Sequence, residues 1–217
     1  MIYYNETQEQ EEVRQRFLDG FHLSNPGEGV KRLVYNLNKM PGVYLVDELV
    51  ALGEIPEDQG DEMRQDAYEG KQMAFVLITP NMIGRGKDNP IIVNPNAFEV
   101  DEGSFHSNLS DHEYFHARDF KYGIPLPNGI VVNYENAEQL QNETLEALLD
   151  SRALLFQLLQ ARDNGRTDQE SFQNALLGFL QYHHRLKQVG PENDFERRVV
   201  NAQIKSYQAI LPPHLRD

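Results

Sequence analysis

The C-terminal part of the sequence, from about residue 137 to residue 210, shows almost unbroken helical periodicity. Two short segments interrupt it, Asp163-Asn164-Gly165 and Gly190-Pro191, and residues of these types favour turns and end helices. The pattern predicts three helices, over Ala137–Arg162, Asp168–Lys187 and Pro191–Ile210. Because an amphipathic helix must bury its apolar stripe against another element, we expect these three to form a C-terminal helical bundle.

The N-terminal part is also mainly helical by its pattern. Caps and apolar spacing predict helices over Glu6–Asp19, with Asn5 as N-cap, and over Gly29–Lys39. Val43–Leu52 is compatible with a helix or a strand, and the spacing of its leucines favours a helix. Asp58–Glu69 is polar and predicts a surface helix.

The middle of the chain has a different texture. Short β-rich apolar runs at Met73–Ile78, Ile91–Val93 and Ile130–Val132 predict strands, and residues 79–90 between the first two predict a loop. A further helix is expected over Ser104–Phe120, closed by Gly123. The fold class predicted is therefore α+β and mainly helical, with a small strand region packed against one central helix.

The length of 217 residues suits a single domain, 1–217. Its expected parts are an N-terminal helical part (1–72), short strands with the central helix (73–134) and the C-terminal helices (135–217). The sequence sets no oligomeric state.

The composition removes several kinds of site and partner. With no Cys, the chain offers neither a thiol nucleophile nor a Cys-ligated metal site. Its net charge of −14 argues against nucleic acid as a partner, because phosphate backbones are also negative. No apolar stretch approaches the roughly 20 residues of a membrane span, and the N-terminus has no intact signal peptide. We expect a protein without a membrane partner, cytoplasmic or exported without a visible signal peptide.

The central helix carries the motif His112-Glu113-Tyr114-Phe115-His116, which has the form H-E-x-x-H. Two histidines four residues apart lie one above the other on one helix face, so both imidazoles can bind one metal ion. The glutamate between them emerges beside the metal, where it can take a proton from water. The motif predicts a metal site with Glu113 as general base.

A catalytic zinc needs a third protein ligand, and no further histidine follows His116 closely. A carboxylate on the following helix is the alternative, and Glu143, Glu146 and Asp150 share one face there. We expect Glu146 as the ligand, with Glu143 as its rival. Asp150 is placed to accept the free ring N–H of a liganding histidine, and Asp119, one turn beyond His116, could orient it as well.

The two segments His112–His116 and Glu146–Asp150 together resemble the zincin metallopeptidases with a glutamate third ligand, the gluzincins. The resemblance covers roughly residues 73–160, and it departs from thermolysin-like members in a longer gap between the two motifs. It implies a zincin-like fold, one zinc ion on His112, His116 and Glu146, Glu113 as base and acid, and Asp150 behind a ligand. It also implies a peptide or protein substrate that pairs with a strand edge, for which residues 75–78 and 91–93 are the candidates.

A hydrolase of this kind uses a second donor to stabilise the oxyanion. The candidate donors are side chains that carry a hydroxyl or an imidazole: Tyr122, Tyr134, Tyr182, His183 and His184. His183 and His184 point to different faces of their helix, so at most one of them can face a cleft.

Two other functions fit parts of the same pattern. A di-iron helical bundle also uses E-x-x-H, but it needs a second copy, and no other Glu stands three residues before a His. A non-catalytic helical binding or inhibitory protein with an unused or structural metal site is the main alternative. The sequence favours a zinc-dependent hydrolase of peptidase type.

Overall fold

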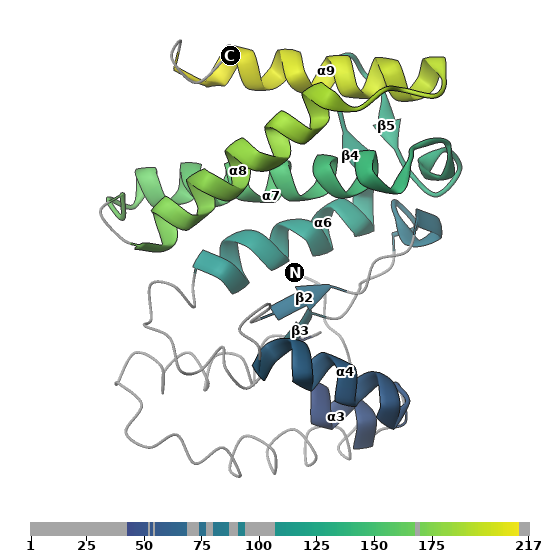
Figure 1. Ribbon diagram of the computed structural model, residues 1–217, viewed down its shortest axis with the longest axis vertical. Coiled ribbons are helices and arrows are strands. Elements are labelled where there is room, and N and C mark those ends of the chain that lie inside the picture. The colour runs from purple at the N-terminus through teal and green to yellow at the C-terminus, as the bar shows by residue number, and fades with distance from the viewer. Residues whose placement is uncertain are drawn as a thin grey trace. The chain divides into compact units, whose positions relative to one another are not determined.

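The computed structural model describes residues 43–51, 53, 55–68, 74–76, 80–86, 91–93, 107–167 and 170–212 (Figure 1). The helices expected over Glu6–Asp19 and Gly29–Lys39 lie outside these residues. Within them the chain is mainly helical with a few short strands, which confirms the predicted α+β, mainly helical class.

The chain divides into two compact units. The first comprises Met1–Leu77 and Asn89–Glu113, and the second comprises Ile78–Asp88 and Tyr114–Asp217. The boundary thus falls inside the H-E-x-x-H motif. A single domain over the whole chain stays a prediction.

The first unit contains a small three-stranded sheet in the order β1-β3-β2, made of Val43–Leu45, Ile91–Val93 and Ala74–Val76. The central strand β3 pairs with β1 in parallel and with β2 antiparallel. Both strands expected around residues 73–78 and 91–93 are confirmed. The segment Val43–Leu52 begins as a strand, since its first three residues pair with β3, and only then becomes a helix.

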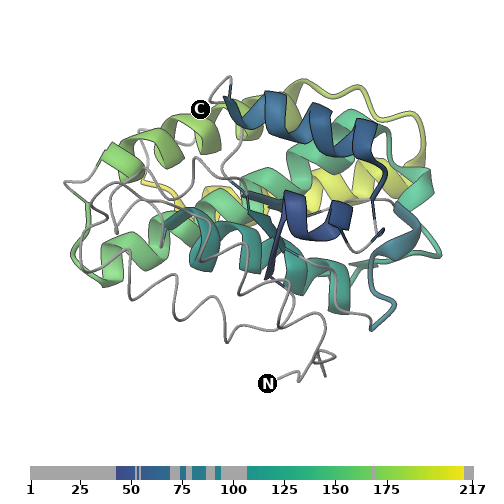
Figure 2. The same cartoon turned by 90° about the horizontal axis from the view of Figure 1, so that it is seen from below.

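Two helices complete the described part of this unit, α3 (Val46–Ala51) and α4 (Glu57–Tyr68), and they pack on each other (Figure 2). The helix expected over Asp58–Glu69 is confirmed as α4. Val46, Leu49 and Ile55 form a core with Ile92 of the sheet, and all four side chains are buried. Leu49, one of the leucines on which the helical prediction rested, is thus a core position of α3.

The second unit is built around the long helix α7 (Asn142–Asp163), which packs against α6 (Tyr114–Tyr122), α8 (Glu170–Gln188) and α9 (Asp194–Ile210) (Figure 1). Helix α7 has neighbours on several sides, and its apolar residues are buried in succession, as at Ala147, Leu148 and Leu149. The C-terminal helical bundle predicted from the periodicity is confirmed.

The second unit also contains several short elements, and the loop that follows the first of them hydrogen-bonds to the C-terminal end of α6. They are two 3-10 turns, η1 (Pro80–Met82) and η4 (Ala137–Gln139), and the paired strands β4 (Ile124–Pro125) and β5 (Val131–Val132). The Gly84 N–H donates to the Phe120 carbonyl at 2.5 Å. Gly123 ends α6 with a φ of 85°, and a Cβ there would lie 3.0 Å from the Val132 carbonyl oxygen. Glycine is therefore required at this helix end for both conformation and space.

A buried glutamate joins the starts of α7 and α9. Glu196 is fully buried and accepts hydrogen bonds from the Gln141 N–H at 3.0 Å, the Thr144 hydroxyl at 2.6 Å and the Glu192 N–H at 2.8 Å. Burial acts to raise the pKa of Glu196, but these hydrogen bonds outweigh it and the pKa is lowered. The carboxylate thus satisfies N–H groups at two helix starts at once.

Candidate metal centre

The segment that carries the motif is not a uniform α-helix. A π-helix, η3 (Ser107–Glu113), leads directly into α6, whereas the sequence predicts one α-helix from Ser104 to Phe120. His112 lies at the end of the π-helix and His116 in the first turns of α6. Turns of π-helix are rare and occur frequently at functional sites, because their wider ring re-aims the side chains that follow.

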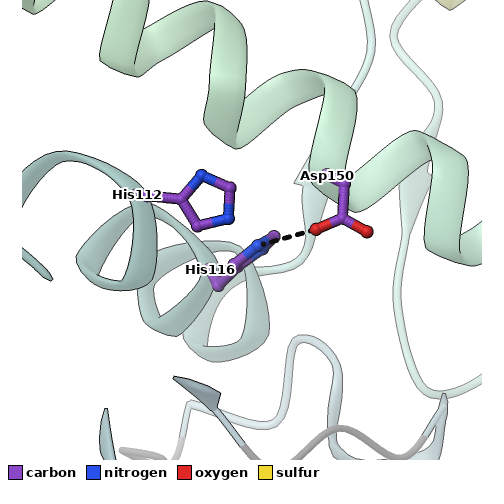
Figure 3. A group of neighbouring side chains, drawn as sticks. All are labelled: His112, His116 and Asp150. Carbon is purple, nitrogen blue, oxygen red and sulfur yellow. Dashed lines mark ion pairs between the residues drawn. The ribbon is translucent and has the colours of Figure 1, made fainter. Parts of the chain in front are cut away.

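His112, His116 and Asp150 come together at this point (Figure 3). One nitrogen of each imidazole and one oxygen of the carboxylate all lie within 4.8 Å of one another. The Nε2 atom of His116 lies 3.3 Å from Oδ1 of Asp150. His116 is 4% exposed, and the other two are partly buried.

This spacing suits a divalent metal ion. Two ligand atoms on a tetrahedral zinc, each about 2.1 Å from the ion, lie about 3.4 Å apart. His116 and Asp150 already have that separation. The ligand atom of His112 lies at most 4.8 Å from the other two, so small side-chain movements would bring all three to a metal ion. Two imidazoles and a carboxylate also form the donor set of one class of catalytic zinc site. The three side chains form a group that could hold a metal ion.

The three acidic residues of the α7 face have different surroundings. Asp150 belongs to the group, although the sequence predicts it behind a ligand rather than as one. Glu146, the expected third ligand, accepts a hydrogen bond from Arg185 of α8 at 3.2 Å, and its side chain is half exposed. Glu143 is exposed in the first turn of α7. The structure therefore brings Asp150, rather than Glu146 or Glu143, together with the two histidines.

Asp119 is held by a different partner. It is 1% exposed, and Arg152 of α7 donates to both of its oxygens, at 2.8 and 3.2 Å. Arg152 also donates to the Pro125 carbonyl and lies over the Phe115 ring. Asp119 thus ties α6 to α7 one turn beyond His116, and its bonds with Arg152 involve both carboxylate oxygens.

Tyr182 of α8 contacts the group through Asp150. Its hydroxyl forms a hydrogen bond with Asp150. Burial and the negative charges of Asp150 and Glu146 raise the pKa of Tyr182 to about 12, although the nearby Arg185 acts to lower it. The phenol is therefore neutral and available as a donor over the whole physiological pH range.

The other candidate oxyanion donors have different contacts. Tyr122 is 66% exposed and lies near Lys121, while the Tyr134 hydroxyl donates to Glu135 at 3.3 Å. His183 is buried and packs against the Phe179 and Tyr207 rings in the core of the bundle. None of these contacts involves the group.

His183 has the environment of a core residue. Burial lowers the pKa of His183, and the neighbouring Lys187 and His184 lower it further. A neutral buried imidazole stacked on an aromatic ring is consistent with packing between helices.

Glu113 follows His112 directly and is buried, with 8% of its surface exposed.

Two residues that contact the acidic side chains near the site were not found from the sequence, Arg152 and Arg185. Their partners, Asp119 and Glu146, lie 33 and 39 positions away along the chain. In the sequence, each of them is only a basic residue on a predicted helix, and this does not identify its acidic partner on another helix.

No protein-family model, curated protein or solved structure matches this chain. Among the residues that the structure describes, no helix combines the length and the apolar character needed to cross a bilayer. The arguments for function therefore depend on the site.

Proposed function

We propose that this protein is a zinc-dependent hydrolase that cleaves peptide bonds, with one zinc ion held by His112, His116 and Asp150. The observation that supports the proposal is the approach of their three ligand atoms to within 4.8 Å, with Glu113 between the two histidines in sequence. Three protein ligands leave one position of a tetrahedral ion open, which is what a catalytic zinc requires.

The proposed ligand set departs from that of the gluzincins in its third member. Glu146 is engaged by Arg185, and a carboxylate that is paired with a guanidinium is a weaker metal ligand because its charge is already compensated. Asp150 faces the His116 imidazole instead. We therefore propose a zincin-like hydrolase with an aspartate third ligand.

Bound zinc would act as a Lewis acid that lowers the pKa of water toward 7 and polarises the scissile carbonyl. The Glu113 carboxylate would accept a proton from the attacking water and pass it to the leaving amine. The net reaction adds one water across the amide bond and yields a carboxylate and an amine. The Glu113 side chain is largely shielded from solvent, which favours proton transfer to a bound reactant over exchange with bulk water.

The sheet of the first unit offers a place for an extended peptide. Of the two candidate edges, β3 is excluded, because it pairs with β1 on one side and β2 on the other. Strand β2 has a single partner among the described strands, and it contacts η3, the π-helix that ends with His112 and Glu113. We propose that the substrate backbone pairs with β2. The net charge of −14 favours neutral or basic peptides.

The first experiment separates metal binding from catalysis. We expect about one zinc per chain in protein purified after growth with zinc, measured by elemental analysis. Glu113→Gln should retain zinc and lose hydrolysis of a defined peptide mixture, monitored by mass spectrometry of the new termini. Glu138→Gln, an exposed glutamate of the second unit, is the matched control and should keep both properties.

Two results would contradict the proposal. A chain without zinc would remove the metal site, and retained hydrolysis in Glu113→Gln would remove the role of Glu113. Zinc without hydrolysis of any peptide would favour the alternative, a helical binding protein with a structural metal site.

The third ligand is tested by alanine variants of the three acidic residues of α7. Asp150→Ala should lose zinc, whereas Glu146→Ala and Glu143→Ala should retain it, because only Asp150 lies with the histidines. Loss of zinc in Glu146→Ala with retention in Asp150→Ala would restore the glutamate assignment.

A further inference from the structure

Helix α8 presents two side chains to the acidic face of α7, one turn apart. The Arg185 guanidinium hydrogen-bonds to Glu146 at 3.2 Å, which fixes how α8 lies along α7. Tyr182, one turn earlier on α8, hydrogen-bonds to Asp150, one turn later on α7. Asp150 in turn faces His116, with 3.3 Å between Oδ1 and Nε2. Three residues from three helices of the second unit, Tyr182, Asp150 and His116, therefore form one connected chain of contacts.

The two partners supplied by α8 differ in charge, and this difference decides which of the two carboxylates suits a metal ion. A guanidinium compensates the charge of Glu146 and competes with a metal ion for it. A phenol is neutral at physiological pH, so it can fix the orientation of Asp150 while leaving the full negative charge of the carboxylate for a cation. The partner of Asp150 thus suits a metal ligand, and the partner of Glu146 does not.

The donor is well fixed. A hydroxyl on an aromatic ring has few rotatable bonds, and Tyr182 lies on the helix that packs most extensively on α7. A carboxylate ligand depends on such a partner, since residues that hydrogen-bond to ligands orient them and typically change metal affinity about 10- to 100-fold when removed.

We propose that Tyr182 is a positioning residue for the metal centre: its hydroxyl holds the Asp150 carboxylate in the orientation that meets the metal ion. This inference rests on the proposed function, since it assigns a role within the same site. It differs from the sequence expectation, in which Tyr182 was one of several candidate donors to the substrate oxyanion.

The test is Tyr182→Phe, which removes one oxygen atom and keeps the ring. We expect zinc to bind about 10-fold or more weakly, measured by competition with a chromophoric chelator. We also expect altered visible absorption bands in the cobalt-substituted protein, because a less constrained carboxylate changes the coordination geometry. Tyr114→Phe is the matched control, since Tyr114 is an exposed residue of α6, and it should bind zinc and cobalt as the wild type does.

The metal-free thermal unfolding midpoint of Tyr182→Phe should stay close to that of the wild type, which separates loss of metal affinity from loss of folding. Zinc affinity within about twofold of the wild type, with an unchanged cobalt spectrum, would overturn the inference. Wild-type protein that binds neither metal would instead overturn the proposed function.

If Tyr182→Phe does not fold, a crystal structure of the zinc-loaded wild type gives the decision. The inference requires the Tyr182 hydroxyl within about 3 Å of the Asp150 oxygen that does not contact the metal. A hydroxyl that has moved away from Asp150, or that contacts the metal itself, would contradict it.

Discussion

The ion pair between Arg152 and Asp119 should be the main polar contact that holds the motif helix to α7. Asp119 is 1% exposed, and Arg152 donates to both of its oxygens. Replacing Arg152 by Met keeps the aliphatic stem and removes the guanidinium. Arg118 also lies near Asp119, at 3.7 Å, but it is substantially exposed and compensates little of the buried charge.

Removing one partner of a buried ion pair costs about 3–5 kcal/mol, because the other charge stays buried without compensation. We expect a loss at the lower end of this range, about 3 kcal/mol. Arg118 stays near Asp119, and the variant loses one further hydrogen bond, to the Pro125 carbonyl. For a chain of this size each kcal/mol shifts the unfolding midpoint by about 2–4 °C, so we expect a decrease of about 6–12 °C.

The assay is urea and thermal unfolding of metal-free protein, followed by circular dichroism. Arg162→Met is the matched control, because Arg162 lies on the same helix in an exposed pair with Asp163 and should cost less than about 1 kcal/mol. The double variant Asp119→Leu with Arg152→Met removes both charges and should recover much of the lost stability. A loss in Arg152→Met no larger than that in Arg162→Met would refute the reasoning.

Two further predictions concern stability elsewhere in the second unit. Glu196→Gln should unfold more easily at pH 7 by about 2–4 kcal/mol, because charged hydrogen bonds at two helix starts are lost. Since the pKa of Glu196 is lowered in the folded state, its contribution is present above the ordinary value of 4.5 and is lost as the pH falls through the folded pKa. The difference between wild type and variant should therefore shrink in acid; urea titrations from pH 7 to pH 3 check this, and a constant difference would contradict it. Gly123→Ala should cost more than Gly165→Ala in the same assay, because both have positive φ but only Gly123 has a neighbour within 4 Å of the added methyl group; equal costs would contradict the steric argument.

Local patterns predicted much of the fold. The helices of the second unit follow from the spacing of their apolar residues and from breakers such as Gly165, and strand β3 follows from its β-branched residues. Val43–Leu45 became a strand because it pairs with Ile91–Val93, and a partner that distant leaves no mark in a local window. The π-helix before α6 was not predicted either, because the four-residue spacing of the histidines indicates an α-helix.

The candidate site could likewise be predicted from the sequence only in part. The two histidines four residues apart were predictable, because a helix brings such positions to one face whatever surrounds it. Glu146 and Asp150 share a face of α7. Which of them lies nearer His116 depends on how α7 is rotated against α6. Packing of the whole bundle sets that rotation, and the partners that distinguish the two carboxylates, Tyr182 and Arg185, lie on a helix far along the chain.

The most direct test of the account is anomalous scattering at the zinc absorption edge from a crystal of protein purified with zinc. The account predicts one peak per chain, about 2.1 Å from a nitrogen of His112, a nitrogen of His116 and an oxygen of Asp150. No peak beside the histidines, or a peak whose third protein ligand is Glu146, would contradict it.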